Sequence, residues 1–319
     1  MGLTGVVVGI DGGGSKTDAV AATPAGEIVA RRRIGTTSPH LIGVDASAKL
    51  VVDVVTEVCG EAPPLAVAVY LSGLDLPSEV STYRAALQRF GWPGLLLVDN
   101  DVFALLRAGT QQPDAVAVVC GTGINAVGRR ADGATVRFPA LGSISGDWGG
   151  GHGLGQEALW YAARAEDGRG EPTALVAAVC AEFGVSSIVE LTEQLHVGRR
   201  DHGELSLLAP AVFVAAAAGD PVATALVDRL AAEIVTMAGT CLRRLDLLER
   251  EVPVVLGGGI LQAKPPLLMA RVYEGLRSVA PRAQVVPLTA PPILGAVQLA
   301  LEAVEATPEA LTRFEAAFA

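Results

Sequence analysis

Residues Gly9–Asp18 read GIDGGGSKTD and follow an apolar run near the start of the chain. The stretch places an acid at the end of an expected strand and three glycines directly after it. Its GSKT ending is shared with phosphate-binding P-loops, and its glycine density is typical of a dinucleotide-binding turn. The fold of the chain therefore depends on which nucleotide-binding fold, if any, this stretch belongs to.

Both familiar motifs fail by position. A P-loop would need glycine where the sequence has Ile10 and Ser15, and a dinucleotide turn starting at Gly12 would need glycine at Thr17. After GGGSK, only the seven residues TDAVAAT precede a turn at 24–26, which is too short for the crossover helix that joins parallel strands. The sequence therefore predicts that this loop joins two antiparallel strands.

The same pattern of apolar strand and glycine turn recurs twice. It is found in AVAVVCGTGINAVGRRADGATVRF (115–138) and again in VPVVLGGGIL (252–261). This repetition indicates an internal duplication, with two similar domains and a nucleotide cleft between them. The polar, proline-bearing segment 109–114 is the expected boundary, which gives domains 1–112 and 113–319.

Composition narrows the class of protein. The 319 residues carry a net charge of −10, which would repel nucleic acid. The most apolar stretch is interrupted by Pro210, so no membrane span is expected, and the N-terminus lacks the pattern of a secretion signal, which favours the cytoplasm. The four cysteines form no C-x-x-C pair and indicate neither a zinc site nor a disulfide framework.

The glycine turns and Asp11 predict a phosphate and metal site. Glycine lets backbone amides approach phosphate oxygens closely, so the turns Gly12–Thr17 and Gly121–Gly123 could clasp a polyphosphate. A carboxylate at a strand end is costly to bury unless it meets a cation, and Mg²⁺ is the natural partner of a nucleotide. Lys16 would add a charge and Thr17 a hydroxyl. The other interpretation of Asp11 is a carboxylate that caps local amides.

Two further acidic segments are candidates for chemistry. Asp99 and Asp101 follow the apolar run LLLV, at a sheet edge where α/β folds bind ligands. One of these two carboxylates can accept the proton of a hydroxyl group whose oxygen attacks a γ-phosphate. Asp99, the first residue after the strand, is assigned instead to the N-cap of a helix. Asp147 lies in a glycine-rich loop before a helix expected near Gly153, and is either a polar group facing the cleft or part of a solvated connector.

With these motifs in order, the chain resembles the N-acetylglucosamine kinase and BadF-type ATPase family of the actin, Hsp70 and hexokinase superfamily. The resemblance rests on GIDGGGSKT, VDNDVFALLRAG, CGTGINAVG and VVLGGGIL, and on GDWGGGHGLGQEAL before a DGRG turn. It implies duplicated ribonuclease H-like α/β domains, use of ATP and Mg²⁺, and phosphorylation of a sugar hydroxyl, with the 6-OH of N-acetylglucosamine or glucosamine as the expected acceptor. It also implies a homodimer, and a last helix, about 292–319, that returns to the N-terminal domain.

The resemblance also implies residue roles. Asp101 matches the general base. Asp11 matches the acid associated with Mg²⁺, which it can bind directly or through a water molecule. ATP binding is assigned to Gly12, Gly13, Gly14, Ser15, Lys16, Thr17, Gly121, Thr122, Gly123, Gly257, Gly258 and Gly259. Sugar binding is assigned to Ser38, His40, Ser72, Gly73, Asp101, Asn125 and Asp147.

Three departures from the family pattern leave the acceptor sugar open. Trp148 stands where the family has glutamate, Leu141 where it has tryptophan, and Ser38 where the animal enzymes have a sugar-binding asparagine. Two other functions remain as alternatives. One is an ATPase that activates acyl-CoA dehydratases through an iron–sulfur cluster, although Cys120 has no second cysteine near it in the sequence. The other is a sugar sensor that has lost catalysis, although Asp101 is present.

Overall fold

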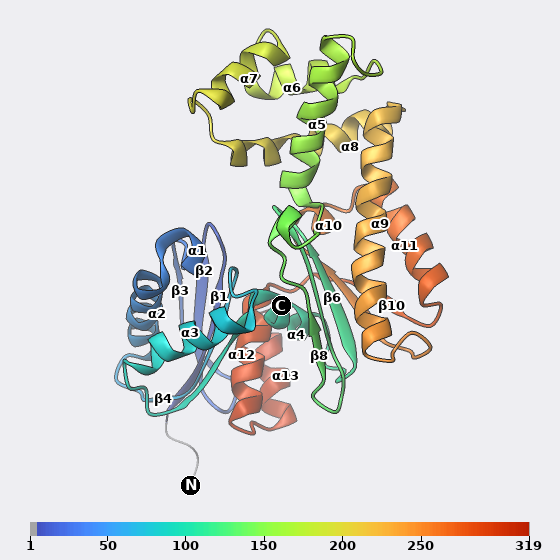
Figure 1. Ribbon diagram of the computed structural model, residues 1–319. Helices are drawn as coiled ribbons and strands as arrows, with labels where there is room; N and C mark the ends of the chain where they lie inside the picture. The colour runs from blue at the N-terminus through green and yellow to red at the C-terminus, as the bar shows by residue number, and fades with distance from the viewer. Residues whose placement is uncertain (1–4, 319) are drawn as a thin grey trace. The chain divides into compact units, whose positions relative to one another are not determined.

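The computed structural model describes residues 5–318, which form two compact α/β units (Figure 1). Unit 1 takes the chain up to Ala117 together with the residues from Leu288 onward, and unit 2 takes Val118–Pro287. The expected boundary at 112/113 lies a few residues before this division. Each unit carries a five-stranded sheet. The α/β class and its duplication are therefore as predicted.

The sheet of unit 1 has the strand order β3-β2-β1-β4-β5. β1 pairs antiparallel with β2, with Gly12 opposite Thr17, so the glycine loop joins antiparallel strands as predicted. β4 and β5 continue the sheet parallel to β1. The strands are β1 (Val6–Gly12), β2 (Thr17–Ala22), β3 (Ile28–Ile34), β4 (Pro64–Leu71) and β5 (Leu95–Asn100).

Helices cover both faces of this sheet, which explains why β1 is a continuous apolar run. Successive side chains point to opposite faces: Val8 and Ile10 pack with α2 and α3, whereas Val7 packs with α4, α12 and α13. The helices are α1 (Pro39–Ile42), α2 (Val44–Cys59), α3 (Pro77–Gln88), α4 (Asp101–Gly109), α12 (Pro292–Ala303) and α13 (Pro308–Ala316).

The C-terminal segment forms two helices instead of the single helix expected over about 292–319. α12 ends at Ala303, and Glu305 adopts a positive φ of 54°. The side chain of Thr307 then caps α13, whose first residue is Pro308. Proline cannot continue a preceding helix but fits the first position of a new one, which explains the break.

α12 fixes α4 through close packing and a buried arginine. A Cβ at Gly295 of α12 would overlap the carbonyl oxygen of Ala104 in α4, so only glycine permits this approach. The side chain of Arg107 is 3% exposed and donates to Glu302 at 2.7 Å and to Gln298 at 2.9 Å. A segment from the end of the chain thus holds the helix that begins at Asp101.

The sheet of unit 2 has the order β10-β9-β6-β7-β8, with β10 parallel to β9 and β8 antiparallel to β7. Its strands are β6 (Ala115–Cys120), β7 (Ile124–Arg129), β8 (Thr135–Arg137), β9 (Pro253–Gly257) and β10 (Gln284–Pro287). β6 begins in unit 1 by the division given above and ends in unit 2. The second and third glycine turns therefore follow β6 and β9, as predicted.

The helices of unit 2 include a group at the end of α5 remote from the sheet, where α6 and α7 lie (Figure 1). No single helix among residues 5–318 has the length and apolarity to cross a bilayer, although two bent pairs would pass by length and composition. The helices are α5 (Gly150–Glu166), α6 (Leu175–Phe183), α7 (Ile188–His196), α8 (Ala209–Ala217), α9 (Pro221–Arg244), α10 (Gly259–Ala263) and α11 (Pro266–Val279), with 3₁₀ turns at Gly142–Ile144 and His202–Leu208.

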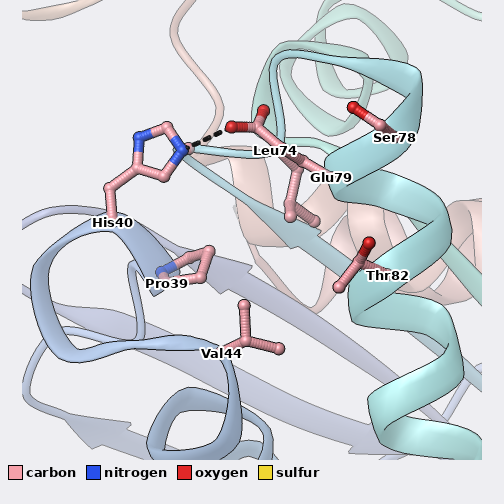
Figure 2. Close-up of a pocket in the computed structure, with 8 residues that line it drawn as sticks. Pro39, His40, Val44, Leu74, Ser78, Glu79 and Thr82 are labelled. Atoms are coloured by element: carbon pink, nitrogen blue, oxygen red, sulfur yellow. Dashed lines mark hydrogen bonds and ion pairs between the residues drawn. The ribbon is translucent and has the colours of Figure 1, made fainter.

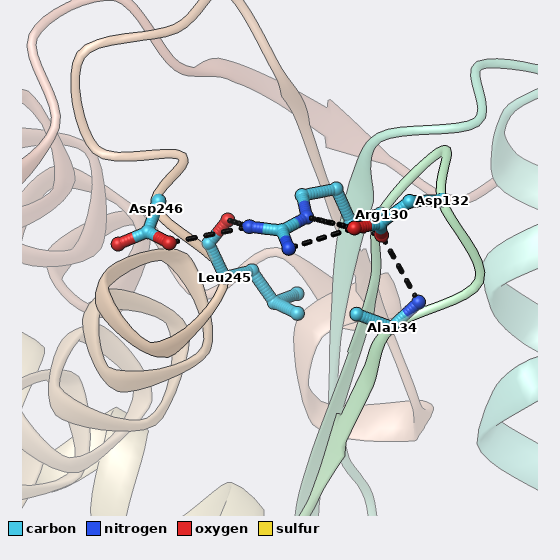
Figure 3. A network of polar contacts seen from close by, with 5 residues as sticks. All are labelled: Arg130, Asp132, Ala134, Leu245 and Asp246. Atoms are coloured by element: carbon cyan, nitrogen blue, oxygen red, sulfur yellow. Dashed lines mark hydrogen bonds and ion pairs between the residues drawn. The ribbon is translucent and has the colours of Figure 1, made fainter.

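One arginine joins the β7–β8 turn to the end of α9 (Figure 3). Arg130 makes a bidentate ion pair with Asp132, and its other nitrogen donates to the carbonyl of Leu245 at 3.0 Å and reaches Asp246 at 3.2 Å. Asp132 also accepts the amide of Ala134. The Arg130 guanidinium holds the pKa of the Asp132 carboxyl down at about 2. The arginine satisfies a terminal helix carbonyl that lacks an intrahelical donor.

Gly295→Ala should destabilise the protein by about 3 kcal/mol, because the added methyl group must push α12 away from the Ala104 carbonyl. Urea unfolding followed by circular dichroism measures this change. Gly35→Ala is the control, since a Cβ at Gly35 meets no atom within 4 Å. Equal unfolding midpoints for the two variants would show that the helix crossing tolerates the extra atom.

Candidate active site

The first glycine turn is a hairpin whose tip is open to solvent. The amide of Gly13 donates to the carbonyl of Lys16 at 2.8 Å, and residues 14–16 are exposed. A Cβ at Gly12 would overlap the side chains of Leu71 and Thr37, so this position requires glycine. The hairpin therefore presents backbone amides and the Lys16 ammonium group to a ligand, in the way that suits phosphate oxygens.

Hydroxyl groups beneath the hairpin fix its shape. Thr17 is fully buried, and its Oγ1 shares a hydrogen bond of 2.8 Å with Oγ1 of Thr37. Thr36 Oγ1 donates to the carbonyl of Gly13 at 2.9 Å. The Thr17 hydroxyl, which the sequence assigns to the phosphate pocket, thus has a partner inside unit 1, whereas Lys16 lies at the open tip.

Asp11 lies next to the end of β1. Protein surrounds most of its surface, and the rest is open to solvent. Burial raises the pKa of its carboxyl to about 7, the nearby Asp18 adds to the rise, and Lys16 opposes it. Asp18 itself pairs with Arg33 at 2.6 Å. No ion pair to Asp11 occurs within residues 5–318, so only the more distant charge of Lys16 offsets that of the carboxylate.

Asp101 lies in the same environment at the carboxyl end of β5, as the first residue of α4. Burial raises the pKa of its carboxyl to about 7, and the negative charges of Asp11 and Asp75 raise it further. The backbone amides of Val102 and of Asp101 itself oppose this rise. Within the described chain, Asp101 has no ion pair. Unit 1 therefore brings the predicted base and the predicted metal-associated acid together.

The helix cap is Asn100, and the assignment of Asp99 to this role is wrong. Asn100 Oδ1 accepts the amide of Val102 at 3.0 Å, whereas Asp99 remains within β5 and accepts the amide of Asn100 at 2.7 Å. An N-cap must directly precede the first helical residue, and Asp101 is that residue. The strand runs two residues further than expected, to Asn100.

The sequence alone missed Asp75. Its Oδ1 accepts the side-chain amide of Asn100 at 2.9 Å, so the cap of α4 is itself held by the loop after β4. Asp75 also lies close enough to Asp101 to raise the pKa of that carboxyl. The available signal was an acid shortly after an apolar strand, in YLSGLD, which is the same signal that identified Asp99 and Asp101.

Four of the predicted sugar-binding residues meet in unit 1. Gly73 has a φ of 82°, and a Cβ there would lie 3.1 Å from Cγ of His40 and 3.2 Å from Oγ of Ser38. The amide of Ser72 donates to the carbonyl of Gly12 at 2.8 Å, which ties this group to the phosphate hairpin. Polar groups, a positive-φ glycine and the hairpin thus adjoin one another.

A small hollow of about 190 Å³ lies beside this group. Figure 2 shows the His40 imidazole turned toward the carboxylate of Glu79, with Nε2 and Oε1 2.8 Å apart. The other oxygen of Glu79 accepts the amides of Asp75 and Leu76 at the start of α3. Within residues 5–318, His40, Asp75 and Glu79 are the one group of three metal-type donors within 4.8 Å of one another, and Asp11 is not a member.

In unit 2, the second glycine turn joins β6 to β7 and receives the start of α5. The amide of Gly121 donates to the carbonyl of Gly123, and the amides of Gly151 and His152 donate to Gly121 at 2.7 Å and to Thr122 at 2.9 Å. Gly150 has a φ of 68°, and a Cβ there would lie 2.5 Å from the carbonyl oxygen of Thr122. Gly150, the first residue of α5, must therefore be glycine for this helix to sit on the turn.

The third glycine turn packs against the second. Gly257 ends β9. Gly258 has a φ of 88°, and a Cβ there would lie 2.5 Å from the carbonyl oxygen of Cys120, so no side chain fits. Gly259 begins α10 close to Gly121. A cavity of about 710 Å³ opens beside both turns, with a mostly apolar lining that includes Thr122, Ser206, Pro210, Phe213, Ile260 and Pro265. Its size and apolar character suit a nucleoside.

Asp147 lines a separate cavity of unit 2, of about 490 Å³. Its Oδ2 accepts a hydrogen bond from the hydroxyl of Ser145. The helix that follows Asp147, α5, begins at Gly150, three residues earlier than expected. Asn125 does not line this cavity, and its Oδ1 accepts the amide of Ala126 at 2.7 Å. Asp147 thus faces a ligand-sized space, and the two sugar-binding residues predicted in unit 2 do not share it.

Comparisons with known proteins agree with the fold and the motifs. The model of the BadF/BadG/BcrA/BcrD ATPase family matches residues 8–300, which confirms the resemblance predicted from the motifs. N-acetyl-D-glucosamine kinase of Dictyostelium discoideum is 25% identical over 315 residues, which cover 93% of this chain and 98% of that protein. N-acetylmuramic acid/N-acetylglucosamine kinase of Clostridium acetobutylicum is 24% identical over 260 residues, with 80% and 85% covered.

Solved structures show the same fold. A protein of Chromobacterium violaceum, provisionally named as an N-acetylglucosamine kinase, superposes with a TM-score of 0.70 at 26% identity, over 93% of this chain and 99% of that one. A ROK family glucokinase of Streptomyces griseus, solved with glucose and AMPPNP, superposes with a TM-score of 0.58 at 17% identity and covers 94% of this chain. The second likeness supports the fold alone.

Asp101→Asn should stabilise the protein at pH 8. The folded pKa of about 7 lies above the unfolded value near 3.8, so the folded state binds the extra proton and stability falls as pH rises from about 4 to about 7. The amide removes this cost, which we expect to be about 1–3 kcal/mol at pH 8 and about a quarter of that at pH 4.5, where the folded carboxyl is still protonated. Thermal unfolding in EDTA at both pH values measures it, with Asp53→Asn at an exposed carboxylate as the control. A variant less stable than the wild type at pH 8 would contradict the prediction.

Proposed function

The chain belongs to the BadF/BadG/BcrA/BcrD ATPase family, and we propose that it is an ATP-dependent kinase that phosphorylates a hydroxyl of a pyranose sugar. Relatives named as N-acetylglucosamine kinases align over most of its length, and the D. discoideum enzyme is matched over 98% of its own chain. The observation that carries the chemistry is the position of Asp101, held without an ion-pair partner in residues 5–318 at the end of β5 beside Asp11.

Asp101 has the properties that a general base needs. A base works best when its pKa lies near the operating pH, and burial has already raised the pKa of this carboxyl to about 7. In the proposed reaction, Asp101 accepts the proton of the sugar hydroxyl as that oxygen attacks the γ-phosphorus of ATP. The bond from phosphorus to the β,γ-bridging oxygen breaks, and ADP leaves.

Position and electrostatics supply the rest of the catalysis. The amides of the Gly12–Thr17 hairpin and the ammonium group of Lys16 can bind phosphate oxygens, because they lie at the open tip and carry the right polarity. The hydrogen bond from the amide of Ser72 to the carbonyl of Gly12 holds the predicted sugar-binding residues next to this hairpin. Unit 1 by itself therefore offers a base, phosphate-binding groups and candidate sugar contacts.

The residues of unit 1 fit a Mg²⁺ ion. Asp11 and Asp101 are hard oxygen donors. Asp18 raises the pKa of Asp11, and Asp11 and Asp75 raise that of Asp101, so these carboxyls have an excess of negative charge around them that a cation would relieve. We propose that Asp11 holds Mg²⁺, directly or through a water molecule. When bound, the ion would neutralise charge on the β- and γ-phosphates.

Unit 2 supplies binding groups for the remainder of the nucleotide. The glycine turns 121–123 and 257–259 lie beside the apolar cavity that includes Phe213 and Ile260, and we assign the adenosine to that cavity. Gly258 packs so closely on the carbonyl of Cys120 that a Cβ would not fit, which fixes the position of the turn at the end of β6. The turn is thus organised before any ligand arrives, which reduces the entropy lost on binding.

The proposed acceptor is N-acetylglucosamine or glucosamine, phosphorylated at the 6-OH. The family relatives favour this class, and the departures at Ser38, Leu141 and Trp148 fall among residues that would touch the sugar. A homodimer and a cytoplasmic location remain part of the proposal. Selectivity among sugars depends on a few contacts of about 1–3 kcal/mol each, so the acceptor must be measured.

The three buried cysteines do not fit the alternative of an ATPase that holds an iron–sulfur cluster. Cluster ligands are thiolates, whereas Cys120 is fully buried and burial raises the pKa of its thiol to about 12. Burial likewise raises the pKa of Cys241 to about 12 and that of Cys59 to about 11. No cysteine of the described chain belongs to a group of three metal-type donors. We therefore favour the kinase.

A coupled assay of ADP release over a panel of hexoses, amino sugars and N-acetylated sugars tests the proposal. We expect release only when Mg²⁺ and an accepted sugar are both present, with N-acetylglucosamine or glucosamine the best acceptor. ADP release at the same rate without any sugar would indicate an ATPase. Saturable sugar binding without ADP release would indicate a sensor.

Asp101→Asn should lower kcat by about 100- to 10,000-fold with little change in sugar binding, because the amide cannot take the proton. Asp99→Asn is the matched control two residues away: its oxygen bonds the amide of Asn100, and asparagine keeps an oxygen that can accept this bond. Steady-state kinetics on both variants compare them. If Asp99→Asn proves the slower enzyme, the base has been placed on the wrong aspartate.

A further inference from the structure

We propose that Trp148 is an aromatic binding surface for the pyranose ring of the acceptor in unit 2. The inference rests on the proposed function and goes beyond it, since neither the phosphate chemistry nor the proposed base uses this residue. It concerns the loop before α5, where Trp148 directly follows Asp147. Both residues line one cavity of unit 2, and Arg229 packs on the indole ring of Trp148.

The cavity has the size and lining of a sugar site. Its volume of about 490 Å³ is within the usual range for sites that bind small molecules. Such sites combine apolar or aromatic surface with a few polar groups that fix orientation. The side chains that provide these features here are Leu141, Ser143, Asp147, Trp148, His152 and Gln156.

Asp147 has an acceptor atom to spare. The hydroxyl of Ser145 donates to Oδ2, which fixes the orientation of the carboxylate. Oδ1 has no hydrogen-bond partner among the described residues. A carboxylate oxygen that faces a cavity is a strong acceptor for a hydroxyl group. His152 and Gln156 add a second polar pair, with Nε2 of each 2.9 Å apart, on the first turns of α5.

The indole of Trp148 is held in one orientation by groups outside the cavity. The guanidinium carbon of Arg229 lies 3.8 Å from the ring centroid, and Arg229 in turn donates to Glu157 at 2.9 Å. Arg229 is on α9 and Glu157 on α5, so an ion pair between two helices holds the guanidinium group that packs on the ring. Gly153 lies beside the indole, at a distance where even a Cβ would only be in van der Waals contact with Nε1, at 3.7 Å.

This arrangement suits a pyranose. A pyranose ring has faces of C–H groups and a rim of hydroxyls, so it needs both an apolar surface and directed hydrogen bonds. One face of the indole packs on Arg229, and we infer that the remaining ring surface faces the cavity beside Asp147. A rigid aromatic surface loses little conformational entropy when a ligand packs on it. Aromatic contact and carboxylate would thus bind the sugar together.

The first test is kinetic. Trp148→Ala should raise KM for the sugar about tenfold while kcat and KM for ATP stay within about twofold, because the contact is present in both the bound state and the transition state. Trp148→Phe should fall in between. The matched control is Trp160→Ala: this side chain also has an arginine over its ring, Arg164 at 4.6 Å, but is 50% exposed and does not line the cavity. We expect wild-type kinetics for it.

The second test needs no turnover and still works if Trp148→Ala fails to fold. The chain has three tryptophans, so full-length protein labelled with 5-fluorotryptophan should give three ¹⁹F resonances, and Trp148→Phe assigns one of them. Titration with N-acetylglucosamine, with glucose and with glucosamine, each alone and with ADP, should shift the Trp148 resonance and leave those of Trp92 and Trp160 in place.

The outcomes separate the two proposals. Phosphorylation of a sugar whose saturating concentration leaves the Trp148 resonance unmoved, or an unchanged KM in Trp148→Ala, would overturn the aromatic surface and leave the kinase intact. A saturable shift of that resonance without any ADP release would support the surface and overturn the kinase. Shifts confined to Trp92 or Trp160 would place the sugar elsewhere.

Discussion

Two carboxylates, Asp11 and Asp101, are held together within unit 1 without an ion-pair partner in the described chain, and much of the surrounding structure keeps them there. Burial raises the pKa of both carboxyls to about 7, and the charge of Asp11 adds to the rise at Asp101, so the arrangement opposes folding at neutral pH. Neighbouring elements offset this cost. The side chain of Asn100 caps α4, and Asp75 holds Asn100 from the loop after β4. A strained, charged site that the rest of a fold stabilises is typical of a functional centre.

The stability of that centre depends on residues distant in the sequence. α4 carries Asp101, and α12 packs against α4 so closely that Gly295 has no room for a side chain. Arg107 is buried and gains its partners from the same C-terminal helix. The C-terminal helices thus belong to unit 1, although unit 2 separates them from it along the chain. A change in α12 would reach the proposed base through rigid packing.

Unit 2 applies the same supersecondary design to a different task. Its two glycine turns pack on each other and on the first turn of α5, with backbone atoms so close that Gly150 and Gly258 admit no Cβ. These turns border a mostly apolar cavity, whereas the hairpin of unit 1 borders charged groups. Duplication therefore gave two similar sheets whose loops differ in polarity. That difference is what assigns adenosine to one unit and phosphotransfer chemistry to the other in the proposed function.

The sequence by itself determined the antiparallel hairpin after β1, the three glycine turns and the acids at the ends of strands, because these depend on local spacing and on the conformations that glycine and proline allow. Local pattern was insufficient at the end of β5, where Asn100 and not Asp99 caps the helix, since the length of the strand decides which residue is the cap. Only the tertiary structure placed Asp75 beside Asp101 and Arg229 over Trp148. Such contacts join residues from separate elements, and their distances depend on how whole helices and strands pack, which no local pattern encodes.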